Sequence, residues 1–203
     1  MITPLHEERL QAVMAVLRLT GARSVADLGC GDGALMLRLL DDPLIERVAG
    51  VEQSPAALTA LKVALAARSH AGREGVSIIE GSMLDPRPEL AGYDAVVMVE
   101  TIEHLPPGQL SRWESAVFDV ITPSVVVITT PNAEYNPVLG VPPHRFRHRE
   151  HMFEWDRPRF RKWVESVAVR RGQRWLVRDI AGVREGLGGA SQMAVFLRPD
   201  LVI

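Results

Sequence analysis

The sequence has almost no cysteine, no long apolar run and no strong excess of charge. Its one cysteine, Cys30, cannot form an internal disulfide, which fits a reducing compartment. No uninterrupted apolar stretch reaches the roughly 18 residues of a membrane span, and the N-terminal MITPLHEERL lacks the basic and apolar segments of a signal peptide. With a formal net charge of −2, any surface for nucleic acid must be local. We therefore expect a cytoplasmic protein without membrane contact.

The sequence does contain enough apolar residues for one substantial core. Its 203 residues are 47% hydrophobic, which suits a single globular domain. We find no internal repeat, low-complexity tract or linker-like segment. We therefore expect residues 1–203 to form one domain.

Short apolar runs alternate with amphipathic segments along the chain. Apolar residues at helical spacing predict a first helix over 5–19, closed by Gly21. The predicted strands are 24–28, 48–52, 76–81, 93–100, 124–130, 174–180 and 192–197. The other predicted helices are 34–40, a segment opened by Ser54-Pro55, 109–120 and 158–168. The stretch 132–155 is expected to be irregular. This alternation predicts an α/β fold. We expect a mainly parallel seven-stranded sheet, covered on both faces, with an antiparallel hairpin at one edge.

A glycine-rich turn follows the first predicted strand and opens the next helix. Gly29, Gly31 and Gly33 stand behind Asp27, and glycine suits a sharp turn that a ligand approaches closely. The spacing differs from the G-x-G-x-x-G dinucleotide fingerprint. It resembles the first motif of class I S-adenosylmethionine-dependent methyltransferases, a Rossmann-like family whose loop wraps the methionine end of the cofactor. The competing interpretations are an NAD site, and glycines that only shape a turn.

Three further residues extend this predicted cofactor site. Glu52 ends the second strand, where a carboxylate can accept hydrogen bonds from both ribose hydroxyls. Ser82 and Met83 follow the third strand, at the level where these methyltransferases hold the adenine. A plainer interpretation is that Glu52 caps a helix.

The fourth predicted strand ends in a cluster of ligand-type residues. Glu100 is its expected last residue, and Glu103 and His104 follow three and four positions later. A helical turn would return both to the face of Glu100, and two carboxylates beside an imidazole would repel unless a cation or protons intervened. Without a metal, Glu103 would be a charge at a helix start and His104 a packed histidine.

The motifs VETIEHL, TTPNAEYN and RFRHREHMFEWDRPRF together resemble the Hen1 family of RNA 3′-terminal 2′-O-methyltransferases. The likeness runs from about residue 5 to 197. It implies that Glu100, Glu103, His104 and His151 are the catalytic metal ligands, with His148 as a nearby alternative to His151. Asp156 stands where the family more often has threonine, and aspartate also caps a helix well.

The resemblance also bears on partners. Many bacterial relatives carry a large additional N-terminal domain, so this sequence is expected to be a free-standing catalytic domain or an excised piece. An RNA end-healing and sealing protein is the partner that the likeness implies.

The predicted chemistry is methyl transfer from S-adenosylmethionine to a ribose 2′-hydroxyl. A bound cation lowers the pKa of a coordinated oxygen and fixes its position. A terminal ribose offers two adjacent hydroxyls to the ion, which explains a requirement for a free RNA 3′ end. Two imidazole ligands favour Mn²⁺, Fe²⁺ or Co²⁺ over Mg²⁺. Mn²⁺ is the predicted ion, and His104 is the predicted proton acceptor.

The segment 144–162 has the composition of a local RNA-binding surface. Its seven basic and three acidic residues give it a charge of +4, and aromatic residues are interleaved with them. Arg145, Arg147 and Arg149 are predicted to contact RNA, and Asn132 and Tyr135 to shape the pocket for the terminal nucleotide. Alternatively the rings pack the core, the arginines face solvent, and Asn132 and Tyr135 are turn residues.

Two other functions remain open from the sequence. One is a small-molecule O-methyltransferase that acts on a catechol-like diol. The other is a non-catalytic module that binds RNA 3′ ends.

Overall fold

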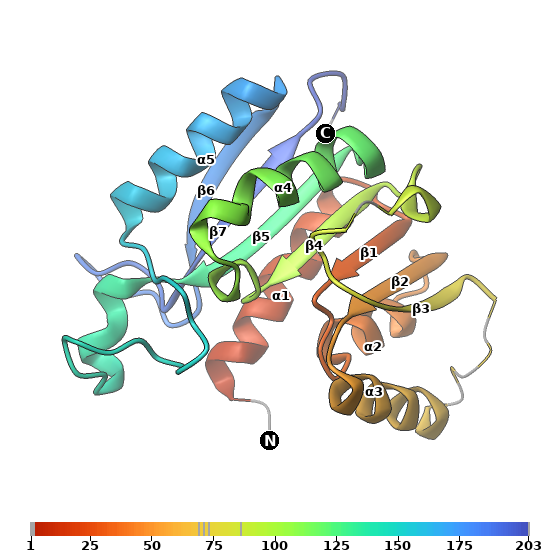
Figure 1. Ribbon diagram of the computed structural model, residues 1–203, viewed down its shortest axis with the longest axis horizontal. Coiled ribbons are helices and arrows are strands. Elements are labelled where there is room, and N and C mark those ends of the chain that lie inside the picture. Colours follow the sequence, from red (N-terminus) through yellow and green to blue (C-terminus); the bar gives the residue numbers. More distant parts are fainter. Residues whose placement is uncertain (1–2, 69, 71, 73, 86, 203) are drawn as a thin grey trace.

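The computed structural model describes residues 3–68, 70, 72, 74–85 and 87–202. Seven strands form one sheet in the order β3-β2-β1-β4-β5-β7-β6 (Figure 1). Their bounds are β1 Ser24–Leu28, β2 Arg47–Glu52, β3 Val76–Glu80, β4 Ala95–Val99, β5 Val125–Pro131, β6 Arg174–Ile180 and β7 Ser191–Leu197. The first five strands are parallel, and β7 pairs antiparallel with β5 and β6. The predicted α/β architecture with its antiparallel edge is therefore confirmed.

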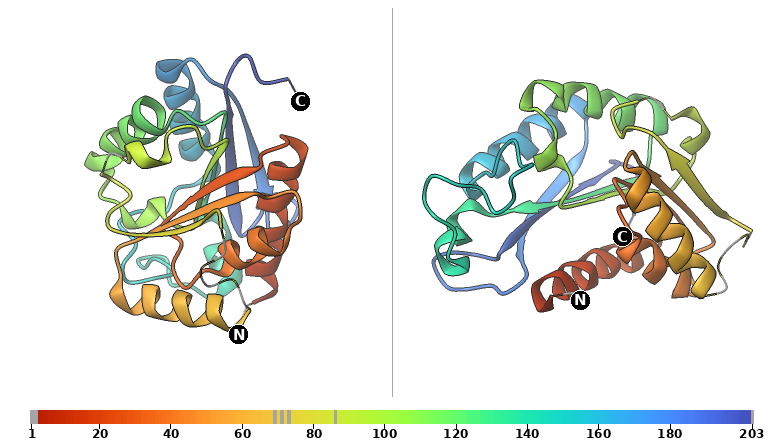
Figure 2. Two further views of the ribbon diagram at one scale, coloured as in Figure 1. Left: turned by 90° about the vertical axis from the view of Figure 1, so that its right-hand side faces the viewer. Right: turned by 60° about the horizontal axis from the view of Figure 1, so that its bottom comes forward.

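Helices cover both faces of the sheet (Figure 2). On one face lie α1 (Pro4–Leu19), α2 (Ala34–Asp41) and α3 (Pro55–Ala67), and on the other α4 (Leu110–Ser115) and α5 (Arg157–Arg171). Successive residues of a strand point to opposite faces, so Val96 packs toward α4 and α5 while Val97 packs toward α1. In the described residues, no helix is both long and apolar enough to cross a membrane.

Sequence signals fix where the helices begin. The side chains of Thr3, Ser54 and Asp156 cap α1, α3 and α5, and each helix has a proline in its first turn. The Asp156 side chain accepts a hydrogen bond from the Arg159 amide over 2.8 Å. Aspartate therefore fills the capping role expected of it.

One local prediction was wrong, and two were incomplete. Strand β4 ends at Val99 instead of Glu100, because Glu100 adopts a left-handed conformation with φ of 52° that leaves the strand. The predicted helix 109–120 is a short α4 between a 3₁₀ turn (Pro107–Gln109) and a π-helix (Ala116–Ile121). The stretch expected to be irregular contains a 3₁₀-helix, Ala133–Leu139, which Asn132 caps.

The aromatic side chains of the basic segment belong to the core. Phe153, Trp155 and Phe160 are buried, and Trp163 packs against the same cluster. Phe153 and Trp155 stack with their ring centroids 4.1 Å apart. These rings hold the segment before α5 against the sheet, as the alternative interpretation of the sequence has it.

Candidate functional site

The glycine-rich turn lies between β1 and α2, at the carboxyl ends of the parallel strands. Gly29, Gly31 and Gly33 all have positive φ, at 79°, 55° and 91°. A Cβ on Gly29 would lie 2.3 Å from the Thr101 Cγ2 atom, and one on Gly33 would lie 2.3 Å from Leu61 Cδ1. Both conformation and space therefore require glycine at these two positions.

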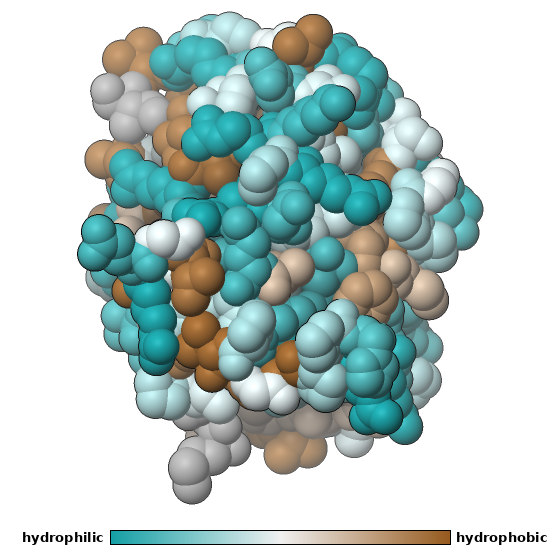
Figure 3. All heavy atoms as spheres, turned by 90° about the vertical axis from the view of Figure 1, so that its left-hand side faces the viewer, coloured by the Kyte–Doolittle hydropathy of each residue, from teal (hydrophilic) through white to brown (hydrophobic). Residues whose placement is uncertain are grey.

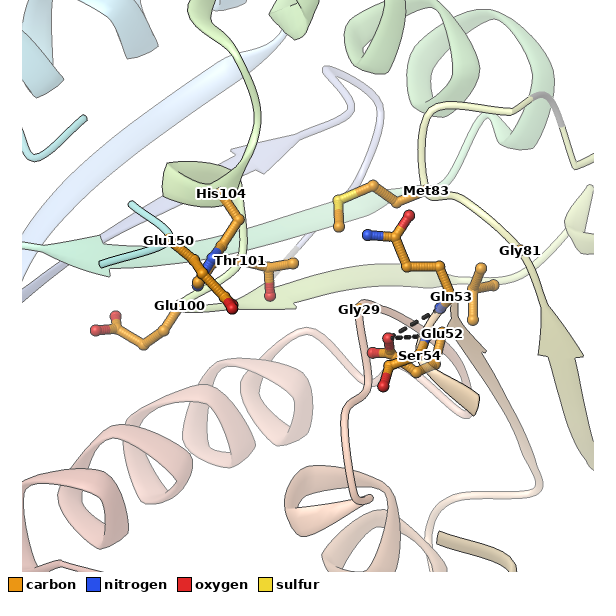
Figure 4. Close-up of a pocket in the computed structure, with 11 residues that line it drawn as sticks. Gly29, Glu52, Gln53, Ser54, Gly81, Met83, Glu100, Thr101, His104 and Glu150 are labelled. Atoms are coloured by element: carbon orange, nitrogen blue, oxygen red, sulfur yellow. Dashed lines mark hydrogen bonds between the residues drawn. The ribbon is translucent and has the colours of Figure 1, made fainter. Parts of the chain in front are cut away.

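The carboxylate of Glu52 organises the floor of a pocket beside this turn (Figure 4). One oxygen accepts the Gly31 amide over 2.9 Å, and the other accepts the amides of Gln53 and Ser54 over 2.9 and 2.8 Å. These backbone bonds hold the side chain in place there. Its oxygens can accept further hydrogen bonds from the diol of a ribose.

The rest of this pocket suits a purine nucleoside. Met83 lines it together with Gly29 and Gly81, and its thioether is directed into the space above Gln53 (Figure 4). Ser82 is not among the lining residues, because its hydroxyl turns back to accept the Leu84 amide over 3.1 Å. Of the two residues predicted at the adenine level, the structure brings only Met83 to the pocket.

A second cavity adjoins the first across Gly29 and Glu100, on the side of α1. Asp27 lines it, is only 2% exposed, and accepts no side-chain hydrogen bond among the described residues. Burial, together with the nearby Glu52 carboxylate, raises the pKa of Asp27 to about 7. An unpaired buried carboxylate here is suited to bind an ammonium group, such as that of a methionine.

We expect the substitution Asp27→Asn to stabilise the ligand-free protein at neutral pH. The folded-state pKa of Asp27 lies above its unfolded value, so ionisation favours the unfolded chain as pH rises from about 4 to 7. Asparagine cannot ionise, and the melting temperature of the variant should exceed that of the parent by a margin that grows over this range and levels off above pH 7. Thermal unfolding at pH 4, 5.5, 7 and 8 measures the margin, and a constant margin would contradict the assignment.

Three of the predicted metal ligands come together beyond the end of β4. Ligand atoms of Glu103, His104 and His151 all lie within 4.8 Å of one another, and the rings of the two histidines are 4.9 Å apart between centroids. Glu103 is completely buried, and its Oε2 atom accepts the Thr130 hydroxyl over 3.0 Å. Its Oε1 atom has no hydrogen-bond partner among the described residues. Such an orphaned buried oxygen calls for a ligand.

Burial also determines the charges of this cluster. It raises the pKa of Glu103 well above its usual value, and the carboxylate of Glu100 adds to the effect. Burial and the neighbouring His151 and His148 lower the pKa of His104, so its imidazole is neutral at pH 7. Two imidazoles and a buried carboxylate are the donor set of a divalent cation site. The residues present therefore fit the metal that the sequence implies.

The histidine from the distant segment is held by two contacts. His151 Nδ1 lies 2.6 Å from Oε1 of Glu154, a carboxylate whose side chain is 1% exposed, so that Nε2 remains for a ligand. The amide of Met152 donates to the Glu103 carbonyl over 2.7 Å. The backbone thus ties the two ligand-bearing stretches together.

Glu100 is not part of this cluster. Its Oε1 atom accepts the Thr129 hydroxyl, and its Oε2 atom lies 3.1 Å from Ser191 Oγ and 3.2 Å from a nitrogen of Arg9. In the close-up its carboxylate points away from His104 (Figure 4). The prediction that a helical turn gathers Glu100, Glu103 and His104 on one face is wrong for Glu100, because its left-handed backbone redirects the side chain.

The predicted RNA-contacting residues divide into two groups. Arg145 and Arg149 are exposed. The face of the molecule drawn in Figure 3 is mainly hydrophilic. Arg147 instead points inward and donates to Asn136 Oδ1 and to the carbonyls of Asn132 and Ala190. The Arg147 side chain therefore links segments of the chain through internal hydrogen bonds.

The two residues predicted at the nucleotide pocket are also internal. Asn132 is fully buried and donates to the carbonyls of Leu187 and Gly189 over 2.9 Å each. The Tyr135 hydroxyl donates to the Gly182 carbonyl over 2.7 Å. Both residues support the 3₁₀-helix and the turn before β7, as the plainer interpretation of the sequence has it.

Sequence reasoning missed two residues of the site. Glu154 lies inside the HMFEW motif, and its spacing of three from His151 could have pointed to it. Arg9 contacts Glu100 from the first helix, 91 residues away, and no local sequence pattern predicts this contact. His148 lies near the cluster, with its ring 5.9 Å from that of His104, and forms with His104 and Glu150 a second, more exposed group.

Comparison with known proteins gives the site a family context. Residues 25–124 match the family model described as a methyltransferase domain. The small RNA 2′-O-methyltransferase of Gallus gallus is 35% identical over 175 residues, which cover 82% of this chain and 46% of that protein. That of Xenopus tropicalis is 32% identical over 207 residues, covering 96% and 55%. The chain spans about half the length of these curated relatives.

Solved structures agree over nearly the whole chain. The methyltransferase domain of bacterial CtHen1 matches with a TM-score of 0.85 and 34% identity, covering 96% of this chain and 100% of that domain. The small RNA methyltransferase HEN1 matches with a TM-score of 0.87 and 28% identity, covering 98% of this chain and 26% of that one. A chain of the Pnkp1/Rnl/Hen1 RNA repair complex, at 16% identity and a TM-score of 0.70, shares the fold.

Proposed function

The chain belongs to the family of Hen1 methyltransferase domains, and from this we propose that it methylates the 2′-hydroxyl of the 3′-terminal ribose of RNA. The methyl donor is S-adenosylmethionine, and a divalent cation, Mn²⁺ by preference, activates the acceptor. One observation carries the proposal: Glu103 has a buried carboxylate oxygen without a partner among the described residues, and this carboxylate lies with two histidines beside a cofactor pocket.

The two adjoining cavities fit the two halves of the donor. Glu52 would accept the ribose hydroxyls, and Met83 would pack against the adenine. Gly29 borders both cavities, so a cofactor that passes over it places its sulfonium near Thr101 and Glu100. The methionine end would then reach Asp27, whose carboxylate pairs with the ammonium group.

Glu103, His104 and His151 would hold the cation. When bound, it supplies a Lewis acid that lowers the pKa of a coordinated hydroxyl. Glu154 holds the ring of His151 so that its second nitrogen faces the cluster. His104 is neutral, as both ligation and proton acceptance require.

The geometry also supports a preference for free 3′ ends. The ligand cluster comprises three side chains from two stretches of chain, which leaves a six-coordinate ion open positions for a substrate. Two vicinal hydroxyls can fill two of these positions, whereas an internal ribose has its 3′-oxygen in a phosphodiester. A partner that heals and seals RNA ends would supply or use such termini, and this remains a prediction from the family likeness.

Methylation of short RNAs with defined 3′ ends tests the proposal. With labelled S-adenosylmethionine and Mn²⁺, an oligonucleotide ending in a 2′,3′-diol should accept the methyl group. Matched oligonucleotides with a 3′-phosphate, a 3′-deoxy or a 2′-deoxy terminus should not. Equal methylation of all four would contradict the role of the diol. Methylation of catechol alone would point to a small-molecule enzyme, and RNA binding without turnover to a binding module.

The substitution Glu154→Gln is expected to weaken Mn²⁺ binding roughly 10- to 100-fold, the usual cost of losing an outer carboxylate behind a metal-bound histidine. Glutamine keeps the shape but no longer favours the tautomer that exposes Nε2 of His151. Isothermal titration with Mn²⁺ measures the change. The matched variant Glu134→Gln, whose carboxylate pairs with Arg157 away from the cluster, should bind Mn²⁺ like the parent. Equal affinities of all three proteins would remove Glu154 from the site.

A further inference from the structure

We infer that Arg9 couples cofactor binding to metal binding. The α-carboxylate of the cofactor's methionine takes the Arg9 guanidinium from Glu100, and the released Glu100 carboxylate becomes a fourth ligand of the cation. The inference rests on the proposed function and adds to it a mechanism that orders the two binding events.

Arg9 is placed to act on Glu100. Its side chain is 11% exposed, and a terminal nitrogen lies 3.2 Å from Oε2 of Glu100. Two guanidinium nitrogens also donate to the Ser191 hydroxyl over 3.1 and 3.0 Å, and a third lies 3.1 Å from Nδ1 of His6. None of these three partners is fixed to Arg9 by a bidentate carboxylate contact, so a better anion can displace Glu100.

Glu100 lies within reach of the metal ligands but is turned away from them. Only Thr101 and Ile102 separate it along the chain from Glu103, and its charge contributes to the raised pKa of Glu103. Its carboxylate belongs to neither group of potential ligands in the described residues. To join the cluster, the carboxylate must leave Arg9, Thr129 and Ser191, and the ion pair with Arg9 opposes that change.

The cavity over the glycine turn brings the cofactor to Arg9. Arg9, Asp27, Gly31 and Glu100 line the same space of about 600 Å³. Among the described residues lining it, Arg9 is the only arginine or lysine. A methionine carboxylate entering this cavity therefore has one strong cationic partner, the group that Glu100 occupies in its absence. Asp27 provides the acidic partner for the ammonium group at the same end.

This exchange makes the two affinities depend on each other. If cofactor binding frees a metal ligand, the cation must strengthen cofactor binding by the same factor, because coupling between two sites is reciprocal. Coupling of this kind typically changes affinity by roughly 5- to 150-fold. The effect requires the amino-acid end of the cofactor, since the nucleoside end would bind beside Glu52 in the other cavity.

Mn²⁺ binding to the full chain tests the inference without reference to turnover. Free Mn²⁺ is followed by electron paramagnetic resonance in three states: no cofactor, saturating S-adenosylhomocysteine, and saturating 5′-methylthioadenosine. The last compound keeps the nucleoside and thioether but lacks the carboxylate and the ammonium group. We expect S-adenosylhomocysteine to tighten Mn²⁺ binding about tenfold, and methylthioadenosine to leave it unchanged.

Two variants distinguish the contribution of Arg9 from the general effect of filling the pocket. In Arg9→Ala, Mn²⁺ should bind more tightly than in the parent before any cofactor is added, and S-adenosylhomocysteine should cause no further gain. Arg18→Ala is the matched control, because Arg18 pairs with Asp42 elsewhere on α1. It should keep the full tenfold response of the parent.

The outcomes distinguish this inference from the proposed function. Mn²⁺ affinity that ignores S-adenosylhomocysteine in the parent, or an equal gain with methylthioadenosine, would overturn the coupling while leaving the metal site intact. A failure of the parent to bind Mn²⁺ in any of the three states would instead overturn the proposed function. If Arg9→Ala does not fold, the comparison of S-adenosylhomocysteine with methylthioadenosine on the parent chain still tests the coupling.

Discussion

Replacing Glu103 by glutamine is expected to slow methylation by at least about 1,000-fold, because loss of a metal ligand forfeits several kcal/mol of transition-state stabilisation. The substitution keeps the size of a fully buried side chain, and an amide can still accept the Thr130 hydroxyl. What it removes is the charge that a cation needs. Initial rates with S-adenosylmethionine, Mn²⁺ and an RNA with a free 3′ end measure the loss.

A second buried glutamate provides the control for this experiment. The Glu114 side chain is 4% exposed and pairs with Arg170 across α4 and α5, outside the cofactor and ligand cavities. Glu114→Gln should lower thermal stability and leave the methylation rate near that of the parent. A rate in Glu103→Gln that matched that of Glu114→Gln would show that Glu103 does not serve the reaction. Affinity for S-adenosylmethionine should persist in both variants.

Replacing Glu52 by alanine should weaken binding of S-adenosylhomocysteine about 100-fold, since each hydrogen bond to a charged group contributes roughly 1.5–3 kcal/mol. The loss has two sources. Alanine removes the acceptor for the ribose hydroxyls, and it releases the Gly31 amide that the carboxylate fixes over 2.9 Å. Isothermal titration with S-adenosylhomocysteine measures the affinity.

The neighbouring strand offers a matched control. Glu80 ends β3 directly opposite Glu52 in the register of the sheet, but its side chain is exposed and does not line the pocket. Glu80→Ala should bind the cofactor like the parent. If both variants lost affinity equally, the effect would come from the charge of the sheet edge and not from contact with the ribose.

The fold could be predicted because the apolar patterns and helix caps in the sequence agree with the positions of the strands and helices in the sheet. Apolar strands such as β5 can only lie in the middle of a covered sheet, and the capping side chains of Thr3 and Ser54 mark helix starts directly. The glycine turn was also visible, because Gly29 and Gly33 occupy conformations and spaces that exclude other residues. In these places one residue and its neighbours decide the structure.

The site could be predicted only in part, because its details depend on long-range contacts. Glu100 has the right spacing for a ligand, yet its direction is set by a positive φ and by Arg9 from the first helix. Arg147 has the composition of a nucleic-acid contact, yet buried carbonyls from distant segments draw it inward. Charge and spacing identify candidate residues, and tertiary partners decide where their side chains point.

The backbone amide of Met152 has a structural role, whereas its side chain has none in this contact. The methionine side chain is 54% exposed, while its backbone nitrogen anchors the loop to the carbonyl of Glu103. Nineteen amino acids can offer that N–H, and proline alone cannot. In a mutational library, position 152 should therefore tolerate almost any residue, from glycine to tryptophan, but not proline.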